Sequence, residues 1–246
     1  MTWDRDQFLL RVQETDVLEP QYAEDVLVRL AHSSAAIEGN AFTLHDTITL
    51  LVDECTPASP THLREVYEVA NHRQALVRIL TAVADDEPLS SRLVLDLHAA
   101  LMDHLVFDRG EFKTSTNIIA GASFEPTPPS QVPQAMMQWA DQVEWQTANL
   151  DGQALLEAVA SSHIAFERIH PFSDGNGRTG RAIIAYQTIR RFGMPAIVLV
   201  SRKSEYIALL DRYDVAGLQQ MLTSALAFEV GRARPELVKP SESSDG

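Results

Sequence analysis

The chain has 246 residues, of which 45% are apolar, so it is long enough to fold around one sizeable hydrophobic core. Its 34 acidic and 20 basic residues give a formal net charge of −14, which argues against a surface that coats nucleic acid or an anionic membrane. The single cysteine, Cys55, excludes an intramolecular disulfide, and no apolar run is long enough to cross a membrane. Because a disulfide scaffold is excluded, we expect a cytoplasmic protein, and the first residues do not match a signal peptide.

The spacing of apolar residues predicts a mainly α-helical chain. The expected helices span residues 20–38, 43–54, 61–84, 90–104, 130–148, 153–169, 177–192 and 215–231. Thr43, Ser90 and Ser130 are typical N-cap residues for three of them. We expect an N-terminal helical region at 1–60, a core domain at 61–232 and a disordered polar tail at 233–246.

Residues 109–129 interrupt the helical pattern, because Thr, Ile, Gly and Pro replace the helix formers there. The dipeptide Ala120-Gly121 could form a tight turn, so this stretch predicts a short β-hairpin followed by a proline-stiffened loop. A compact surface loop is the alternative interpretation.

The segment IHPFSDGNGRTGR, at 169–181, lies between two expected helices. Pro171 disfavours helical geometry at the residue before it, so we expect the first helix to end near His170. Gly175, Asn176 and Gly177 can present successive N–H groups at the start of the second helix, where the positive end of the helix dipole attracts anions. This loop is therefore a candidate phosphate-binding site.

Charged side chains in the same segment extend this interpretation. Arg178 and Arg181 are three residues apart, so they share a helix face near its N-terminus. Asp174 is a hard oxygen ligand of the kind that binds Mg²⁺ together with phosphate groups. A histidine ordinarily titrates near neutral pH, so we expect His170 to be able to act as a general base toward a hydroxyl nucleophile. Together they predict a site for a polyphosphate with Mg²⁺.

Other interpretations of the segment are weaker. Gly175, Gly177 and Gly180 formally match the G-x-G-x-x-G dinucleotide fingerprint, but that fingerprint follows a strand, and a helix is expected here. The chain has no Walker A motif. A tight turn between helices, with the arginines pairing surface acids, is the structural alternative. His163 lacks a close metal-ligand partner, so we expect it to pack in the core.

These residues resemble the signature of the Fic (Fic/Doc) family, HPFx[D/E]GNGRxxR, with every fixed position present from His170 to Arg181. The resemblance extends over roughly residues 30–230 and implies an all-α Fic fold, a helical bundle with a short β-hairpin flap. It also implies a protein adenylyltransferase, which moves AMP from ATP to a Ser, Thr or Tyr hydroxyl of a target protein.

The resemblance assigns roles within the segment. It implies that His170 is the general base, that Phe172 is a buried anchor, and that Asp174 binds Mg²⁺ or Mn²⁺. The phosphate-binding residues that it implies are Gly175, Asn176, Gly177, Arg178 and Arg181. It also places Tyr206 near the adenine, although a tyrosine there could equally belong to the core.

The expected hairpin at 117–124 resembles the flap with which the family docks its target. The flap residues that the resemblance implies are Asn117, Ile118, Ile119, Ala120 and Gly121. Docking would pair the flap with an extended segment of the target through main-chain hydrogen bonds, with little selection of sequence.

The segment SSAAIEGN, at 33–40, ends an expected helix. On residues alone, Glu38 is a surface acid that opposes the helix dipole. The segment nevertheless resembles the family's inhibitory motif, [S/T]xxxE[G/N], formed here by Ser34, Glu38 and Gly39. That resemblance implies that Glu38 pairs with Arg181 in the place of the γ-phosphate, supported by Ser34. The unmodified chain would then transfer AMP very slowly.

Two further functions stay open. Glu38 could instead orient a water that removes AMP from a modified protein, or the fold could serve as a non-catalytic module that senses or binds ATP. Expected partners are ATP and a protein target, with auto-modification and a homo-oligomer as further expectations. We expect no direct contact with nucleic acid or membrane.

Overall fold

The computed structural model describes residues 4–58, 62–117 and 124–233. Over these residues the chain forms ten α-helices and two short 3₁₀ turns, without a strand. In chain order they are α1 (Arg5–Thr15), α2 (Pro20–Ile37), α3 (Leu44–Leu51), α4 (Leu63–Ala84), α5 (Ser91–Leu101), η1 (Pro129–Gln131), α6 (Val132–Asn149), α7 (Gly152–Ile169), α8 (Asn176–Phe192), η2 (Val200–Arg202), α9 (Lys203–Arg212) and α10 (Val215–Ala233). The predicted all-α class is confirmed.

Every helix expected from the sequence is present, but α1 and α9 were not predicted. The reason is their narrow buried faces: α1 buries Phe8 and Val12, and α9 buries Tyr206, so neither gives a clear apolar period. Ser130 as an N-cap was wrong. It lies inside η1, and α6 begins two residues later at Val132.

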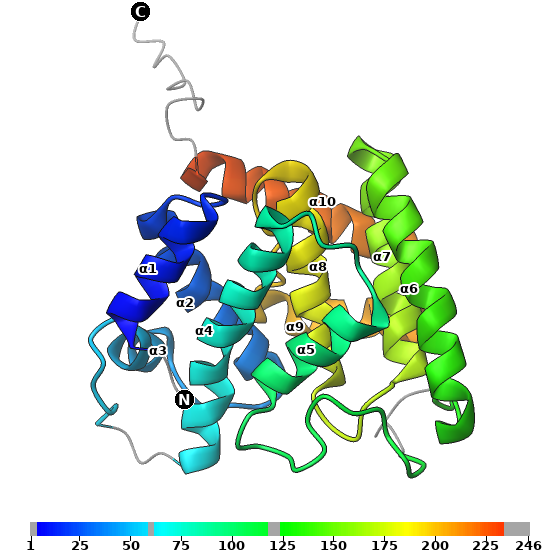
Figure 1. The fold of residues 1–246 in the computed structure, drawn as a ribbon, viewed down its shortest axis with the longest axis horizontal. Helices are drawn as coiled ribbons and strands as arrows, with labels where there is room; N and C mark the ends of the chain where they lie inside the picture. Colours follow the sequence, from blue (N-terminus) through cyan, green and yellow to red (C-terminus); the bar gives the residue numbers. More distant parts are fainter. Residues whose placement is uncertain (1–3, 59–61, 118–123, 234–246) are drawn as a thin grey trace, which may run out of the picture.

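Helix α8 lies in the middle of the molecule, with other helices around it (Figure 1). It packs against α2, α4, α5 and α7. Ile183 and Tyr186 join one hydrophobic cluster, while Ile184 faces another. A helix that is buried on every side is held rigidly, so the residues at its N-terminus have a fixed position.

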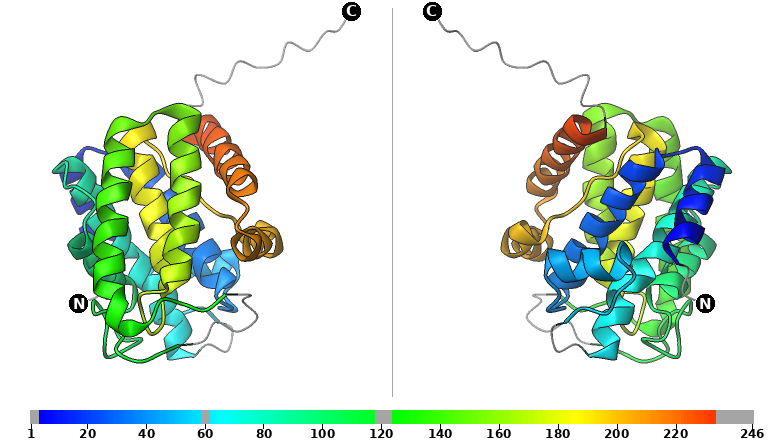
Figure 2. Two further views of the ribbon diagram at one scale, coloured as in Figure 1. Left: turned by 90° about the vertical axis from the view of Figure 1, so that its right-hand side faces the viewer. Right: turned by 90° about the vertical axis from the view of Figure 1, so that its left-hand side faces the viewer.

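The two hydrophobic clusters lie on either side of α8. The larger is built from α1 to α6 and α8 with the end of α7, and the smaller mainly from α7 to α10. In both views of Figure 2, α10 runs along the side of the molecule opposite α5. Phe8 and Leu27 belong to the larger cluster, so residues before 60 share a core with those after it. The division at residue 60 stays a prediction.

Three parts of the chain meet at one end of α8, as Figure 1 shows. They are the loop between α7 and α8, the segment between α5 and α6, and the start of α4. The first two are joined directly, because the Lys113 N–H donates to the Pro171 carbonyl at 2.8 Å. The signature segment therefore lies where distant parts of the chain converge.

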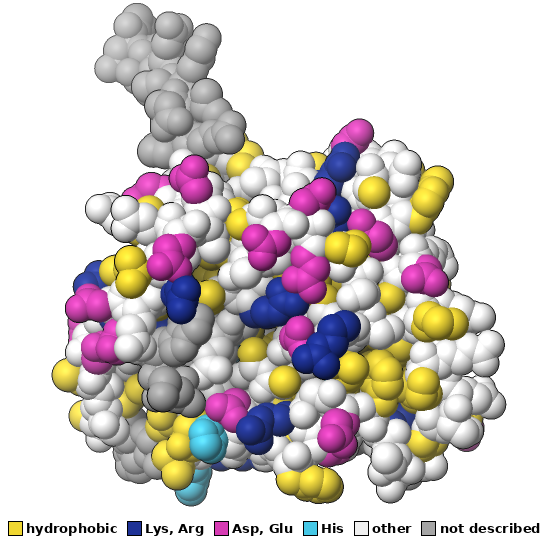
Figure 3. Space-filling model, viewed as in Figure 1, with side chains coloured by type: hydrophobic (Ala, Val, Ile, Leu, Met, Phe, Trp, Pro, Cys, Tyr) yellow, Lys and Arg dark blue, Asp and Glu magenta, His cyan; other side chains and the backbone are white. Residues whose placement is uncertain are grey.

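Acidic and basic side chains are interspersed on the face seen in Figure 3. No helix within the described ranges has the length and apolar character needed to cross a bilayer. The residues at 109–117 and 124–129 contain no strand. The central part of the predicted hairpin, 118–123, and nearly all of the predicted tail lie outside the described residues.

Candidate active site

His170 lies at the end of α7, as the proline after it predicted. Its N–H donates to the Phe166 carbonyl at 2.9 Å, and its backbone is left-handed, with φ 50°. Nδ1 lies 3.2 Å from the Glu167 carbonyl, and a carbonyl only accepts, so the proton is on Nδ1 and Nε2 is left as an acceptor. Burial, assisted by the Lys113 cation, lowers the pKa of His170 to about 4. The imidazole is neutral at pH 7 and can accept a proton.

The loop after His170 is fixed by three side chains. Phe172 is fully buried and stacks on His98, with ring centroids 3.7 Å apart. The Asn176 amide accepts from the Phe172 N–H and donates to its carbonyl, both at 2.9 Å. Nδ1 of His98 accepts from the Gly110 N–H, so Nε2 carries the proton and donates to the Asp174 carbonyl at 3.0 Å. The loop geometry is thus set without a ligand.

Gly175 makes the turn into α8. Its φ is 82°, a left-handed conformation that side chains rarely adopt, and a β-carbon there would lie 2.5 Å from Sδ of Met102. Its N–H donates to Oδ1 of Asp174 at 2.6 Å. The following N–H groups, from Asn176 and Gly177, begin α8 and have no partner within the helix. This end of α8 can receive an anion.

Both signature arginines are buried and paired with carboxylates. Arg178 is 2% exposed and donates to Oδ1 of Asp174 at 3.0 Å, with Glu68 at 3.5 Å on its other side. Arg181 is bonded to Glu38 instead. Both guanidinium groups are therefore buried near the N-terminus of α8, where the carboxylates of Asp174, Glu68 and Glu38 balance their charge.

Glu38 lies at the C-terminus of α2, with Gly39 (φ 103°) following it. Its Oε1 accepts from Nη2 of Arg181 at 2.7 Å. Arg181 also donates to Ser34, to its hydroxyl at 3.1 Å and to its carbonyl at 2.9 Å. Burial opposes ionisation of Glu38, yet Arg181 holds its pKa below the ordinary value. The structure therefore brings Ser34 and Glu38 of the motif-like segment to the N-terminus of α8.

Asp174 is the candidate metal ligand, and its carboxylate is 41% exposed. Both oxygens accept from arginines: Oδ1 from Arg178 and Oδ2 from Arg64 at 2.8 Å. Within the described ranges, no cluster of three His, Cys, Asp or Glu side chains could hold a metal ion alone. One carboxylate fits a Mg²⁺ ion whose other ligands come from phosphates and water, which is how that ion commonly binds.

Among the expected flap residues, Asn117 is described, and its side chain bonds to the loop. Its amide donates to the Phe172 carbonyl at 2.9 Å and accepts from Nζ of the buried Lys113 at 2.7 Å. Burial lowers the pKa of Lys113. The segment entering the expected flap is thereby fastened to the signature loop. The remaining expected flap residues, Ile118, Ile119, Ala120 and Gly121, lie outside the described residues.

Tyr206 and His163 are buried near the side chain of Arg181. Tyr206 is 1% exposed, and its hydroxyl is 2.7 Å from Nε2 of His163. The Arg181 guanidinium lies 5.9 Å from the Tyr206 ring centre. His163 therefore packs in the core, as expected, while contact of Tyr206 with an adenine stays a prediction.

Several residues at this site were missed by the sequence reasoning. Arg64, Glu68, Asn40, His98 and Lys113 all contact the loop, α8 or each other. The i,i+4 spacing of Arg64 and Glu68 on α4 was a signal for their own pair, but nothing in it pointed to Asp174. Asn40 lies in the quoted segment 33–40, where the sequence indicated only the end of a helix, and His98 and Lys113 left no local signal.

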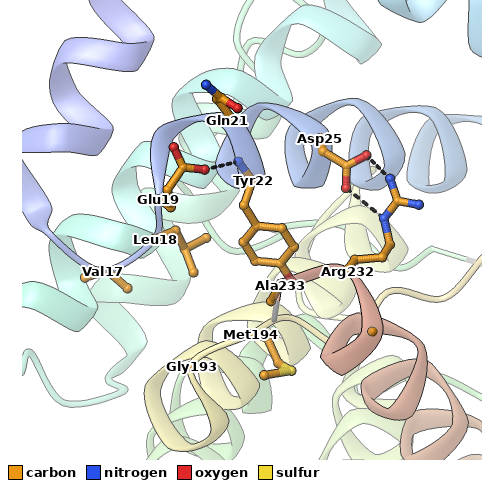
Figure 4. A pocket seen from close by; sticks show the side chains of 11 residues that line it. Val17, Leu18, Glu19, Gln21, Tyr22, Asp25, Gly193, Met194, Arg232 and Ala233 are labelled. Atoms are coloured by element: carbon orange, nitrogen blue, oxygen red, sulfur yellow. Dashed lines mark hydrogen bonds and ion pairs between the residues drawn. The ribbon is translucent and has the colours of Figure 1, made fainter. Parts of the chain in front are cut away.

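A separate groove of about 710 Å³ lies at the opposite end of α8, lined by residues of α2, α10 and the turn at Gly193 (Figure 4). Of the groove's polar groups, Asp25 pairs with Arg232 and Glu19 accepts from the Tyr22 N–H at 2.9 Å, while the Tyr22 hydroxyl donates to the buried Glu229 outside the lining at 2.7 Å. The described residues that line the groove include no histidine to act as a base, so the loop end of α8 is the stronger candidate for the active site.

Comparison with known proteins agrees with a candidate active site at the loop between α7 and α8. The sequence pattern of the Fic/DOC family matches residues 88–188, which include the whole signature segment. The chain is 29% identical over 222 residues to protein adenylyltransferase fic-1 of Caenorhabditis elegans and 28% identical over 215 residues to that of Caenorhabditis briggsae. These alignments cover 87% and 85% of this chain but only 42% and 40% of those proteins. The chain thus spans about two fifths of the length of the curated relatives it matches.

Solved structures share the fold. A Fic domain containing signaling protein from Bacteroides thetaiotaomicron superposes with a TM-score of 0.77 at 23% identity, covering 96% of this chain and 98% of that one. Residues 134–508 of Fic-1 from C. elegans give 0.74 at 21% identity, covering 94% and 73%. Together with the signature loop at the N-terminus of a buried α8, these findings show that the chain carries a Fic/DOC family domain at residues 88–188 within an all-α Fic fold.

Proposed function

We propose that this chain is a protein adenylyltransferase, which transfers AMP from ATP to a Ser, Thr or Tyr hydroxyl of a target protein. The observation that carries the proposal is the neutral His170, whose Nε2 is an acceptor beside the anion-receiving end of α8. Similarity to curated protein adenylyltransferases supports the same activity.

The proposed reaction needs no covalent enzyme intermediate. Nε2 of His170 takes the proton of the target hydroxyl as its oxygen attacks the α-phosphorus of ATP. The new oxygen–phosphorus bond forms as the bond to the β-phosphate oxygen breaks, and pyrophosphate leaves with that electron pair. The N–H groups of Asn176 and Gly177, with the Arg178 cation, stabilise the phosphate charge.

Asp174 would hold Mg²⁺ or Mn²⁺ together with phosphate oxygens of ATP. Its half-exposed carboxylate supports this role, and burial, which by itself raises the pKa, is outweighed by Arg178, so the group stays ionised. A divalent cation, when bound, neutralises phosphate charge and orients the leaving group.

Glu38 would act as an inhibitor built into the chain. Its carboxylate is bonded to Arg181, the second signature arginine, and so stands where a γ-phosphate would otherwise receive that cation. ATP would then bind without its terminal phosphate in the productive place. The hydrogen bonds from Arg181 to Ser34 support this position of Glu38.

AMP removal from a modified protein is the second candidate function. It is favoured by the ionised state of Glu38, because a carboxylate close to the loop could orient a water for attack on an AMP–protein bond. A non-catalytic ATP-binding module is the third. We also propose a cytoplasmic location, a target docked on the flap, auto-modification and a homo-oligomer, with no direct nucleic-acid or membrane contact.

The deciding experiment measures label transfer from ATP labelled at the α-phosphate, with Mg²⁺, to the chain itself and to proteins of a cell extract. Wild type, Glu38→Gly, and Glu38→Gly with His170→Ala are compared, and each is first shown to be folded and to bind ATP. Strong labelling by Glu38→Gly alone supports an inhibited transferase. Absence of labelling with all three, despite ATP binding, contradicts it, and release of AMP from a pre-modified protein then tests the second function.

A further inference from the structure

Four charged side chains form a closed ring beside the signature loop. Arg64 donates to Oδ2 of Asp174 at 2.8 Å, and Oδ1 of Asp174 accepts from Arg178 at 3.0 Å. Arg178 lies 3.5 Å from Oε1 of Glu68, which accepts from Nε of Arg64 at 3.0 Å. The ring joins α4 to the loop and to α8, and its charges alternate in sign.

The two arginines of the ring are held very differently. Arg178 is 2% exposed, on the first turn of a buried helix, whereas Arg64 is 51% exposed at the start of α4. A buried guanidinium has little freedom to move, while a half-exposed one can reach solvent at small cost. Arg64 is therefore the movable member.

The two oxygens of Asp174 also differ. Oδ1 is held by the Gly175 N–H at 2.6 Å as well as by Arg178, so it belongs to the folded loop. Oδ2 accepts from Arg64, and the structure gives it no partner from the loop itself. The oxygen that Arg64 covers is thus the one best placed to bind an incoming cation.

We propose that Arg64 is a positioning residue that gates cation entry at Asp174. It neutralises the carboxylate before the cation arrives and leaves Oδ2 when the cation binds. A guanidinium and a divalent cation repel each other, so simultaneous binding to one carboxylate oxygen is unfavourable. The proposal rests on the proposed role of Asp174 in binding Mg²⁺ with ATP.

Glu68 provides a place for Arg64 after it leaves Asp174. Nε of Arg64 is already bonded to Glu68, whose other oxygen, Oε2, accepts from the Asn40 amide at 3.0 Å. Because Asn40 fixes this carboxylate, Arg64 can swing about a stationary partner rather than lose both its ion pairs. When Arg64 leaves Asp174, it therefore loses one ion pair to solvent and keeps the ion pair with Glu68.

The test is the dependence of ATP affinity on the cation, measured with the full chain by isothermal calorimetry. Wild type and Arg64→Gln are titrated with ATP in Mn²⁺ and in EDTA, and bound Mn²⁺ is counted by its electron paramagnetic resonance signal. Arg92→Gln is the matched control, because Arg92 forms a similar i,i+4 pair with Asp96 on α5 and is 81% exposed.

In Arg64→Gln, affinity for ATP with Mn²⁺ should rise about two- to fivefold, the range expected for removing an exposed ion pair. Affinity in EDTA should not rise, because Asp174 then faces the phosphates without its counter-ion. Arg64→Lys should fall between, and Arg92→Gln should match wild type.

The gate proposal would be overturned if Arg64→Gln changed ATP affinity equally with Mn²⁺ and with EDTA. Weaker ATP binding by this variant with Mn²⁺ would overturn it as well. Label transfer is not needed for this result. A cation-dependent gain in Arg64→Gln, alongside no transfer by Glu38→Gly, would support the gate while the proposed activity fails.

Discussion

Glu38 lies directly over Gly177 at the N-terminus of α8: a β-carbon on this glycine would be 2.5 Å from Oε1 of Glu38 and 3.0 Å from Nη1 of Arg181. Only glycine leaves room for the carboxylate and guanidinium to meet there. The carboxylate is stabilised both by Arg181 and by the positive end of the helix dipole. A group of the chain itself thus takes the position that suits an external anion.

The first prediction concerns Ser34, whose hydroxyl accepts from Nε of the buried Arg181. Ser34→Ala removes a hydrogen bond to a charged group, worth about 1.5 kcal/mol, so label transfer should rise roughly tenfold over wild type. It should stay below Glu38→Gly, because the Ser34 carbonyl still holds Arg181. Ser33→Ala, a neighbouring buried serine not bonded to Arg181, is the control. A rate unchanged from wild type would count against the supporting role of Ser34.

The second prediction concerns the pH profile of transfer. The pKa of His170 is lowered to about 4 by burial, so the base is fully available down to about pH 5. In Glu38→Gly, kcat/KM should stay level from pH 8 to about 5 and fall tenfold per unit below about 4. Circular dichroism at each pH checks that the chain is folded. A fall centred near pH 6.5 would show that an unshifted histidine acts instead.

The third prediction compares the glycines that flank α8. Both Gly175 and Gly193 have positive φ, 82° and 72°, so alanine at either costs about 1 to 2 kcal/mol. Only at Gly175 would the new β-carbon also meet Met102. Gly175→Ala should therefore lower the melting temperature more than Gly193→Ala. It should also weaken ATP binding, which Gly193→Ala leaves intact. Equal melting temperatures and equal ATP affinity would contradict the turn described here.

The fourth prediction concerns Glu167, whose pKa burial raises to about 8. The folded carboxyl is protonated at pH 7, whereas the unfolded one is ionised, so stability falls as pH rises from about 4.5 to about 8. Glu167→Gln removes this titration and should raise the free energy of unfolding at pH 7 by about 1 to 3 kcal/mol.

At pH 4.5 the difference between Glu167→Gln and wild type should shrink to about 0.4 kcal/mol, because the folded carboxyl is then protonated and the unfolded one is about half protonated. Glu157→Gln, at an exposed position on the same helix, should leave the pH dependence unchanged. Urea unfolding at both pH values measures the effect. A gain for Glu167→Gln that is equal at both pH values would mean that packing, and not protonation, stabilises the variant.

The signature loop could be predicted because its chemistry is local. Pro171 ends α7, Gly175 permits the left-handed turn, and the arginine spacing follows from the helix period. The helices with broad apolar faces could be predicted for the same reason. Helices α1 and α9 could not be predicted, because each buries only one or two residues, and those residues pack against parts of the chain that are distant in sequence.

The ring of charged side chains around Asp174 could not be predicted from local sequence patterns. Arg64 is 110 residues from Asp174, and their pair depends on how α4 packs against α8. The hydrogen bond from His98 to the Asp174 carbonyl spans 76 residues. Local sequence patterns indicate neither of these two contacts. Family resemblance pointed to Glu38 and Arg181 where residue patterns alone favoured a surface acid.

The fixed loop from Phe172 to Asn176 has a thermodynamic consequence. Its backbone is held by the Asn176 amide and by His98, and these bonds form when the chain folds. An arriving nucleotide finds few torsions left to restrict, so little conformational entropy is lost on binding. If Glu38 and Arg64 act as proposed, control of this site displaces side chains that are already in place and does not require this loop to become ordered.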